Sequence, residues 1–288
     1  MKRRKALFAA QSLVLVLCVV CGATSATAQS DATSIRAMGM GRAATASATG
    51  SGALFHNPAG VSALMMYSVE AAFSHDMGSG LNTLQASITD GKSNPSIGGG
   101  VGYRYATSTR NAELPSFTGH DVFGVLSAPI VPGVLLIGAG IHYIDYSQFD
   151  NELARGVTLD SGLMVNLGDF ISFGAAVQNI LKVDGADQNL ETSFGLNYHS
   201  HIFQVSFDTQ VEFADEENFV NYGVGAEFMI GQSVPIRAGY HRDARNDEQN
   251  ISAGVGYRSA VIGGDILFIQ DVVDTSNRLL GLALNVYL

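Results

Sequence analysis

The 288-residue chain is 47% hydrophobic and only 15% charged, with 26 acidic and 16 basic side chains and a net charge of −10. Soluble domains typically carry about 25% charged residues, so this composition is unusual for one. The acidic balance argues against nucleic-acid binding, because such proteins neutralise phosphates with Lys and Arg.

Residues 1–28 have the three regions of a secretory signal peptide. Four basic residues precede an apolar run over residues 6–20, and an Ala-Thr-Ala triplet ending at Ala28 provides a cleavage site. The apolar run is shorter than the about 20 residues of a membrane-spanning helix. Cleavage near Ala28 would remove both cysteines and leave twelve basic against 26 acidic residues, a net charge of −14. The exported chain must then be stable without disulfides.

Residues 29–66 are rich in Gly, Ala, Ser and Met and show no regular alternation. Pro58 restricts Asn57 to extended conformations and suits the first position of a helix, so we expect Asn57 to cap a short helix over 59–64. The segment has too few large side chains to build a core, and we expect few large apolar contacts to hold it in place.

From Tyr67 onward, apolar side chains recur at every second position, which predicts β-strands. In residues 156–168 one face carries Val157, Leu159, Leu163, Val165 and Leu167, and the other carries Thr158, Asp160, Gly162, Asn166 and Gly168. The same division recurs in 203–213 and 281–288.

About fourteen such segments can be counted, with twelve as the lower bound. They begin near Tyr67, Leu81, Ile97, Asp121, Val134, Gly156, Ile171, Leu190, Ile202, Asn221, Ile236, Ile251, Val261 and Leu279. The segment over 121–130 is the least clear, because it is apolar on both faces. A repeat of about 16 residues suits membrane-spanning strands of about 9–11 residues plus a connection.

Connections of two lengths are predicted between these strands. Tight ones fall at 130–134, 166–170, 198–201 and 257–261, and longer polar ones at 106–120, 145–156, 212–219 and 241–250. Short turns on the periplasmic side and long loops outside are typical of outer-membrane barrels.

The sequence therefore predicts an all-β fold: a transmembrane antiparallel β-barrel of about 14 strands over residues 67–288, with residues 29–66 as a short N-terminal lumenal plug. A lipid bilayer admits only helices and closed barrels, because every backbone donor and acceptor must be paired. The alternative, a soluble periplasmic β-sandwich, would carry more Lys and Glu on its second face, which here holds glycine, serine, asparagine and isolated charges.

The stretch RAMGMGRAATASATGSGALFHNPAGVSAL, residues 36–64, resembles the amino-terminal segment of the FadL superfamily of outer-membrane proteins, including its PorV/PorQ-like branch. Both have an arginine with paired glycines, a small-residue run and Asn-Pro-Ala-Gly. The resemblance implies a fourteen-stranded barrel with this segment folded into the lumen as a plug or hatch. It assigns the plug motif to Arg42, Asn57, Pro58, Ala59 and Gly60. The chain is shorter than many fatty-acid transporters of this family and ends on Leu288 rather than an aromatic residue.

Alternation also predicts charged side chains that face the lumen. These are Glu70, Arg104, Asp160, Glu191, Asp208, Glu212, Glu227, Arg237, Arg258 and Asp265. We expect them to pair with one another or with Arg36 and Arg42, because an unpaired charge in a confined space is costly; a selectivity or substrate-binding role is the alternative. Inward glycines at 138, 140, 223, 225, 254 and 256 leave room for either the plug or a permeation path.

No catalytic, metal or cofactor site is expected. The spacing of the histidines does not indicate any serine as a nucleophile. The pair His199 and His201, without further ligands, is only weak evidence for a metal site. The resemblance implies passage of small hydrophobic or amphipathic compounds, with a non-conducting PorV-like barrel that binds secreted cargo or partner subunits as the alternative. The expected location is the outer membrane of a Gram-negative cell, and the expected partners are its lipids and the barrel-assembly machinery.

Overall fold

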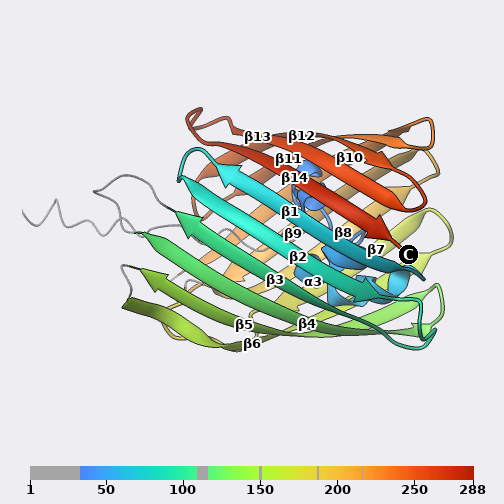
Figure 1. Ribbon diagram of the computed structural model, residues 1–288, viewed down its shortest axis with the longest axis horizontal. Coiled ribbons are helices and arrows are strands. Elements are labelled where there is room, and N and C mark those ends of the chain that lie inside the picture. Colours follow the sequence, from blue (N-terminus) through green and yellow to red (C-terminus); the bar gives the residue numbers. More distant parts are fainter. Residues whose placement is uncertain (1–32, 109–115, 149–150, 187, 216) are drawn as a thin grey trace, which may run out of the picture. The chain divides into compact units, whose positions relative to one another are not determined.

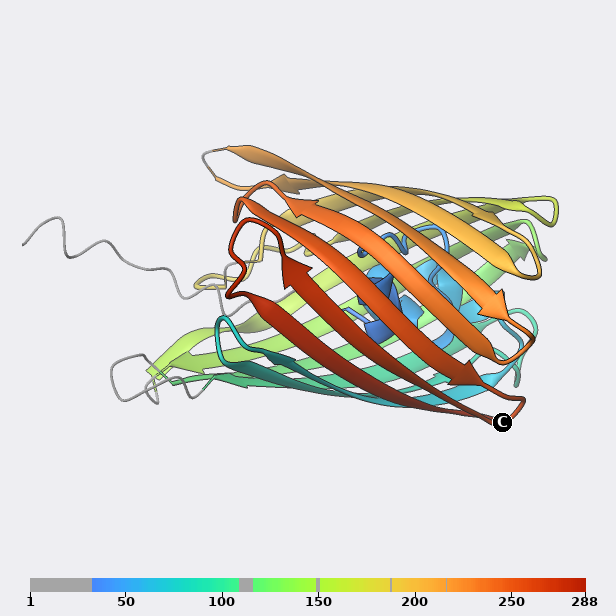
Figure 2. The ribbon, with the colours of Figure 1, turned by 90° about the horizontal axis from the view of Figure 1, so that it is seen from above.

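The computed structural model describes residues 33–108, 116–148, 151–186, 188–215 and 217–288. The predicted signal peptide and its cleavage site lie outside these residues. Fourteen antiparallel strands in the described part form a closed barrel, in which each strand pairs with its sequence neighbours and β14 pairs with β1 (Figures 1 and 2). The predicted fold class and strand number are confirmed. A closed barrel leaves no unpaired sheet edge.

Most strands begin within three residues of the predicted positions. They are β1 (Tyr67–Asp76), β2 (Leu81–Asp90), β3 (Gly98–Ser108), β4 (Phe117–Val131), β5 (Leu135–Gln148), β6 (Asn151–Leu167), β7 (Ile171–Gln178), β8 (Leu190–His199), β9 (Phe203–Phe213), β10 (Asn218–Ile230), β11 (Val234–Asp243), β12 (Glu248–Arg258), β13 (Ile262–Asp271) and β14 (Arg278–Tyr287). The four predicted tight turns all join consecutive strands. No helix among the described residues is long and apolar enough to cross a membrane.

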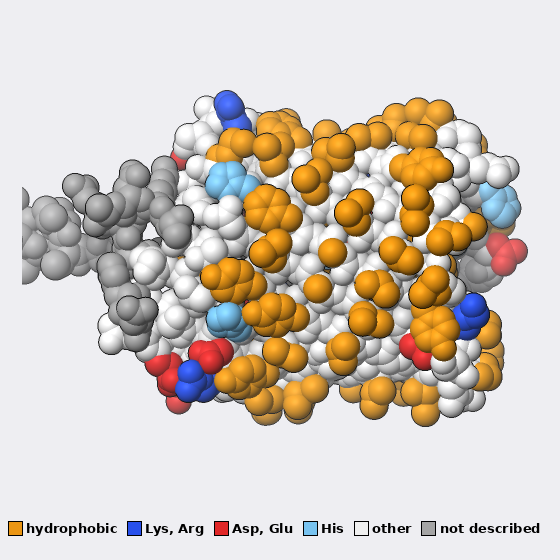
Figure 3. Space-filling view, in the orientation of Figure 1, with side chains coloured by type: hydrophobic (Ala, Val, Ile, Leu, Met, Phe, Trp, Pro, Cys, Tyr) orange, Lys and Arg blue, Asp and Glu red, His pale blue; other side chains and the backbone are white. Residues whose placement is uncertain are grey.

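The apolar face of the strands points outward. Leu126, Leu159, Phe194, Phe207 and Leu284 are all exposed on the wall. On the face shown in Figure 3, hydrophobic side chains spread over the whole wall, and charged side chains gather near its two ends. A soluble sandwich would bury this face, so the sandwich alternative is wrong, and the exterior is the one that a hydrocarbon environment requires.

Three of the four predicted long connections are wrong. Residues 145–156 lie mostly in β5 and β6, and β9–β10 and β11–β12 are joined by only 214–217 and 244–247. The strand ends in these stretches carry several charged and polar side chains, so their composition resembles that of a loop. The fourth, 106–120, contains residues 109–115, which lie outside the described part. The connection over 179–189, between β7 and β8, was not predicted.

Residues 33–63, which we call the lumenal segment, lie inside the barrel (Figures 1 and 2). They contain four short helices: α2 (Ile35–Gly39), η1 (Gly50–Gly52), α3 (Ala53–His56) and η2 (Pro58–Ala63). The prediction that Asn57 caps a short helix is confirmed: η2 is a 3₁₀-helix with Pro58 in its first turn, and Asn57 Oδ1 accepts a hydrogen bond from the Ala59 amide at 3.1 Å.

The core sits between the lumenal segment and the wall. Leu54 and Phe55 of α3 pack with Phe123 and Val125 of β4 in one buried cluster. The expectation that the segment lacks the side chains for a core is therefore wrong, because seven of the nine residues of this cluster belong to the lumenal segment. This contact also explains why β4 is apolar on both faces: one face meets the exterior and the other meets α3.

Candidate functional site

Glycines on the lumenal face of the wall bring the strands against the backbone of the lumenal segment. A Cβ atom would overlap that backbone at Gly138 of β5, Gly174 of β7, Gly223 and Gly225 of β10, and Gly239 of β11. The sequence left open whether the inward glycines make room for a plug or for a path. At three of the six predicted positions the lumenal segment occupies the space, whereas at Gly140 and Gly256 wall carboxylates lie closest.

Asn57 ties two parts of the lumenal segment to the wall. Its side chain is fully buried, and its Nδ2 donates to the carbonyl oxygens of Thr45 at 2.7 Å and Leu163 of β6 at 3.1 Å. With the cap to Ala59, one amide group satisfies three backbone groups. Only a side chain with a donor and an acceptor at this reach can do so.

The rest of the predicted plug motif depends on close backbone approach. The carbonyl of Ala59 accepts a hydrogen bond from Ser127 Oγ of β4 at 2.8 Å. A Cβ at Gly60 would overlap the carbonyl of Ala48. Arg42 has a positive φ of 59°, directly after Gly41 at 61°, which forms a tight turn against β10 and β11. The motif therefore specifies how the segment turns and fits against the wall.

Asp208 of β9 holds the backbone of the lumenal segment with its carboxylate. Its Oδ2 accepts hydrogen bonds from the amides of Ala44 at 2.8 Å and Thr45 at 2.7 Å, and the side chain is buried. Hydrogen bonds to an ionised acceptor are stronger than neutral ones, so Asp208 is a strong anchor for this turn.

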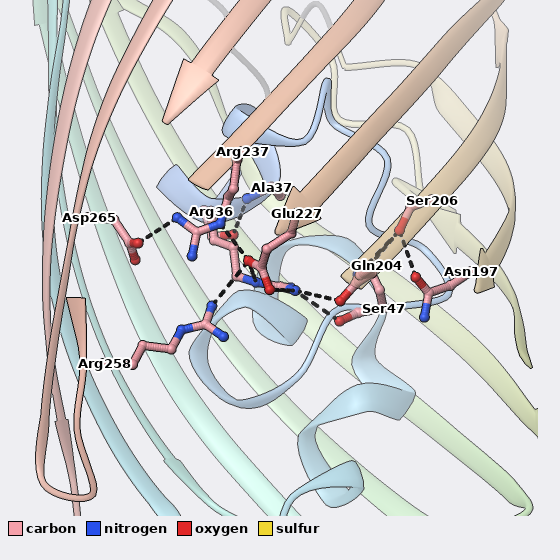
Figure 4. A network of polar contacts seen from close by, with 11 residues as sticks. Arg36, Ala37, Ser47, Asn197, Gln204, Ser206, Glu227, Arg237, Arg258 and Asp265 are labelled. Carbon is pink, nitrogen blue, oxygen red and sulfur yellow. Dashed lines mark hydrogen bonds and ion pairs between the residues drawn. The ribbon is translucent and has the colours of Figure 1, made fainter. Parts of the chain in front are cut away.

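A cluster of charges joins α2 to four wall strands (Figure 4). Glu227 of β10 accepts from Arg237 Nε of β11 at 2.6 Å and from Arg36 Nε of α2 at 3.3 Å. Arg237 also pairs with Asp265 of β13 at 2.5 Å, and Arg258 of β12 lies 3.5 Å from Glu227. The structure thus brings together Arg36 and four of the predicted lumenal charges, in the order β10 to β13 around the wall.

A second buried cluster lies on β3, β4 and β5. Asp121 accepts from Arg104 Nε at 2.6 Å, from Tyr146 OH at 2.6 Å and from His142 Nε2 at 3.1 Å. Arg104 was predicted to face the lumen, but its partners Asp121 and Tyr146 were missed. If the start of β4 had been placed four residues earlier, at Phe117, every second residue from there would have been assigned to the lumen. Asp121 is one of these residues.

The remaining predicted lumenal charges are dispersed. Asp160 Oδ1 accepts from the Asn179 amide at 3.0 Å, and Glu212 Oε1 accepts from Arg245 at 2.6 Å. Glu191 accepts from Ser193 Oγ at 3.1 Å. Glu70 lies on β1 and hydrogen-bonds Asn285 of β14. Among the described residues, Asp160, Glu191 and Glu212 form no common site with Glu227, whereas Glu70 lies near enough to feel the charge of Asp265.

His56 of α3 is the buried titratable group of the lumenal segment closest to the Asn-Pro pair. It is hydrogen-bonded to Thr33, and burial, followed by the nearby charge of Arg42, lowers its pKa from 6.5 to about 3. His56 is therefore neutral in place at any ordinary pH. Within the described residues, no three His, Cys, Asp or Glu side chains are placed to hold a metal ion.

An apolar groove of about 400 Å³ lies on the outside of the wall, across β14, β1, β2 and β3. Its lining is Ala71, Ala72, Phe73, Leu84, Gln85, Ala86, Tyr103, Leu282, Ala283 and Leu284. Ala72 and Ala283 also pack inside with Ile35 and Met38 of α2. At this place the wall consists of the paired backbones of β1 and β14, and its inward side chains next to α2 are the small Ala72 and Ala283.

Solved structures share this architecture. The toluene transporter TbuX of Ralstonia pickettii superposes with a TM-score of 0.66 at 12% identity, covering 89% of this chain and 97% of that one. The toluene transporter TodX of P. putida gives 0.67 at 12% identity, covering 89% and 96%. This likeness shows the fold.

The FadL-like barrel predicted from residues 36–64 is thereby supported, while the PorV/PorQ-like branch is not. No protein-family model matches the sequence. No curated protein matches it either. At this identity the comparisons establish the architecture, and function has to be argued from the site.

Proposed function

We propose that this protein is an outer-membrane barrel that facilitates the passage of small hydrophobic or amphipathic compounds past the lumenal segment, which acts as a plug. The observation that most supports this proposal is the position of the apolar groove. It faces the side where hydrocarbon would lie, and behind the paired backbones of β1 and β14 the small side chains of Ala72 and Ala283 pack on Ile35 and Met38 of α2. An apolar compound in the groove would therefore stand next to the one apolar patch of α2.

The physical basis is the transfer of apolar surface. Burying an apolar compound in an apolar groove contributes about 25 cal/mol for each Å² removed from water. Displacement of α2 would open space behind the alanines, and the compound could follow along the barrel axis or through the wall. The likeness to two toluene transporters supports this substrate class.

The same proposal covers location and biogenesis. Residues 1–28 would direct export and be cleaved near Ala28, and the barrel-assembly machinery would insert residues 67–288 into the outer membrane, among its lipids. The apolar exterior and the closed strand order support this route. No enzymatic activity is part of the proposal.

The second candidate is a non-conducting barrel that binds secreted cargo or partner subunits, as the PorV/PorQ-like resemblance implies. The observation in its favour is the tight fit of the lumenal segment against glycines of four strands, β5, β7, β10 and β11, including Gly138, Gly174 and Gly239. A permanently filled lumen would leave the outer surface and the loops as the working parts.

Uptake of toluene into liposomes separates the two candidates. The mature protein would be compared with a deletion of residues 29–60 and with Gly138→Val, whose side chain would overlap the backbone at Ala59. The matched control is Gly254→Ala, because a Cβ there meets its nearest atom at 3.4 Å. We expect uptake by the intact protein above empty liposomes, faster uptake with both plug variants, and no change with the control. No uptake by the intact barrel or by either variant would reject the transport proposal and favour the partner-binding candidate.

A further inference from the structure

The charge cluster at α2 contains more positive than negative groups. Arg36, Arg237 and Arg258 surround the carboxylates of Glu227 and Asp265. Glu70, the next carboxylate around the wall, bonds to Asn285, and its Oε1 has no hydrogen-bond partner in the described part of the chain. No ion pair joins it to the three arginines in the described part of the chain, although it lies near enough to feel the charge of Asp265.

Two of these arginines have N–H groups that could donate further hydrogen bonds. Arg237 is buried, and its Nη2 has no hydrogen-bond partner among the described residues, although Nε and Nη1 are bonded. Arg258 makes one ion pair, at the long distance of 3.5 Å, and its side chain is 31% exposed. A buried donor without a partner costs about 1–3 kcal/mol, so an acceptor placed here would stabilise the cluster.

The position of Arg258 makes the cluster accessible from one end of the barrel. Arg258 is the last residue of β12, next to the tight turn 259–261, at the end where the chain leaves β14. Figure 4 shows its side chain reaching from the wall toward Glu227, with the guanidinium of Arg237 on the same side. Short turns mark the periplasmic end of such barrels. A solute from the periplasm could therefore reach Arg258 without crossing the lumenal segment.

We propose that Arg258, Arg237 and Arg36 form a binding site for a small oxyanion of the phosphate or carboxylate class, which enters from the periplasmic end. The planar guanidinium offers paired donors that match the oxygens of such anions. The anion accepts hydrogen bonds from Arg258 and from the Nη2 of Arg237 that has no partner among the described residues. This site is separate from the apolar groove, and anion binding to it can be measured without any uptake.

Occupancy of the site holds the lumenal segment in place. Arg36 belongs to α2, whereas Arg237 and Arg258 belong to the wall, so an anion among them joins the two parts. A ligand that binds only the arrangement with α2 in place stabilises that arrangement by mass action. Oxyanion concentration therefore sets how often α2 leaves the wall.

The test uses the mature barrel in detergent, titrated by calorimetry with inorganic phosphate, with benzoate and with chloride. Phosphate tests binding of a free inorganic oxyanion, and benzoate tests binding of a carboxylate attached to an apolar ring. Chloride shows how much of any effect comes from screening of the arginine charges alone. We expect saturable binding of at least one oxyanion, weakened tenfold or more in Arg258→Gln and partly kept in Arg258→Lys. Arg155→Gln is the matched control, since Arg155 is exposed and pairs with Asp145 on β5.

Hydrogen exchange of the α2 amides gives a second readout. The bound oxyanion should slow this exchange threefold or more in the intact protein and leave it unchanged in Arg258→Gln. Absence of saturable binding, equal binding by Arg258→Gln, or an equal effect of chloride would each overturn the proposal. Because no step measures uptake, failure here leaves the transport proposal standing, and the reverse also holds.

Discussion

The two ends of the lumenal segment are attached to the wall by different forces. α2 and the turn after it combine apolar packing of Ile35 and Met38 with charged contacts: Arg36 pairs with Glu227, and Asp208 binds two backbone amides. α3 and η2 are held by packing of Phe55 on Phe123 and by the neutral amide of Asn57. Charged contacts between partly exposed groups weaken as salt screens them, whereas the packing of Phe55 on Phe123 carries no charge to screen. We therefore expect α2 to be the end whose release from the wall can be controlled, and η2 to be the end that stays attached to the wall.

The largest effect is expected from removing the aromatic contact at the packed end. Phe123 packs edge-on against Phe55 at 5.1 Å and stacks on His142 at 4.1 Å. Phe123→Ala should lower the free energy of opening of α3 by about 3–5 kcal/mol, measured by hydrogen exchange of the α3 and η2 amides. Leu126→Ala, on the outer face of the same strand, should leave that exchange unchanged. An equal loss in both variants would mean that β4 itself, rather than the contact, was weakened.

Removal of the Asn57 amide should come next. Asn57→Ala leaves the carbonyls of Thr45 and Leu163 and the amide of Ala59 without their partner. We expect a loss of about 3 kcal/mol in the stability of η2, because buried polar groups without partners are costly. Limited proteolysis between residues 53 and 63 reports the change. Wild-type protection in this variant would show that packing alone holds η2.

Acid should destabilise the packed end through His56. A free histidine takes up a proton near pH 6.5, whereas His56 in place does so only near pH 3. The stability is therefore complete above pH 6.5 and falls as the pH drops toward 3, by about 2 kcal/mol at pH 5. Hydrogen exchange of the α3 amides between pH 5 and pH 7, corrected for intrinsic rates, measures the slope. His56→Gln should remove it, and an unchanged slope would assign it to another group.

The smallest effect is expected from one ion pair at the charged end. Arg36 is partly exposed, so Arg36→Gln should cost about 1 kcal/mol in the opening of α2 and leave η2 unchanged. Raising the salt concentration from 0.1 to 1 M shortens the screening length from about 10 to about 3 Å and should loosen α2 in the wild type more than in this variant. Equal salt dependence in both would contradict a charge-held α2.

Some features of the site could be predicted locally. The cap at Asn57 and the start of η2 at Pro58 depend on neighbouring residues only, and the sequence placed both within one residue. The pairing of Arg104 with Asp121 was missed, because β4 was the strand whose two faces looked alike. Its inner face is apolar only to meet Leu54 and Phe55, a contact that no local pattern contains.

By itself, the sequence determined the fourteen strands, their tight turns and which face of each points outward, because a strand repeats every two residues and the bilayer selects one face. Tertiary structure alone decided which lumenal charges meet and what fills the space of each inward glycine. Arg36 and Glu227 are 191 positions apart, and Ser252 and Gly39, which also meet across the lumen, are 213 apart. Such pairs depend on the closure of the barrel and on the path of residues 33–63 inside it, and alternation along one strand carries no information about either.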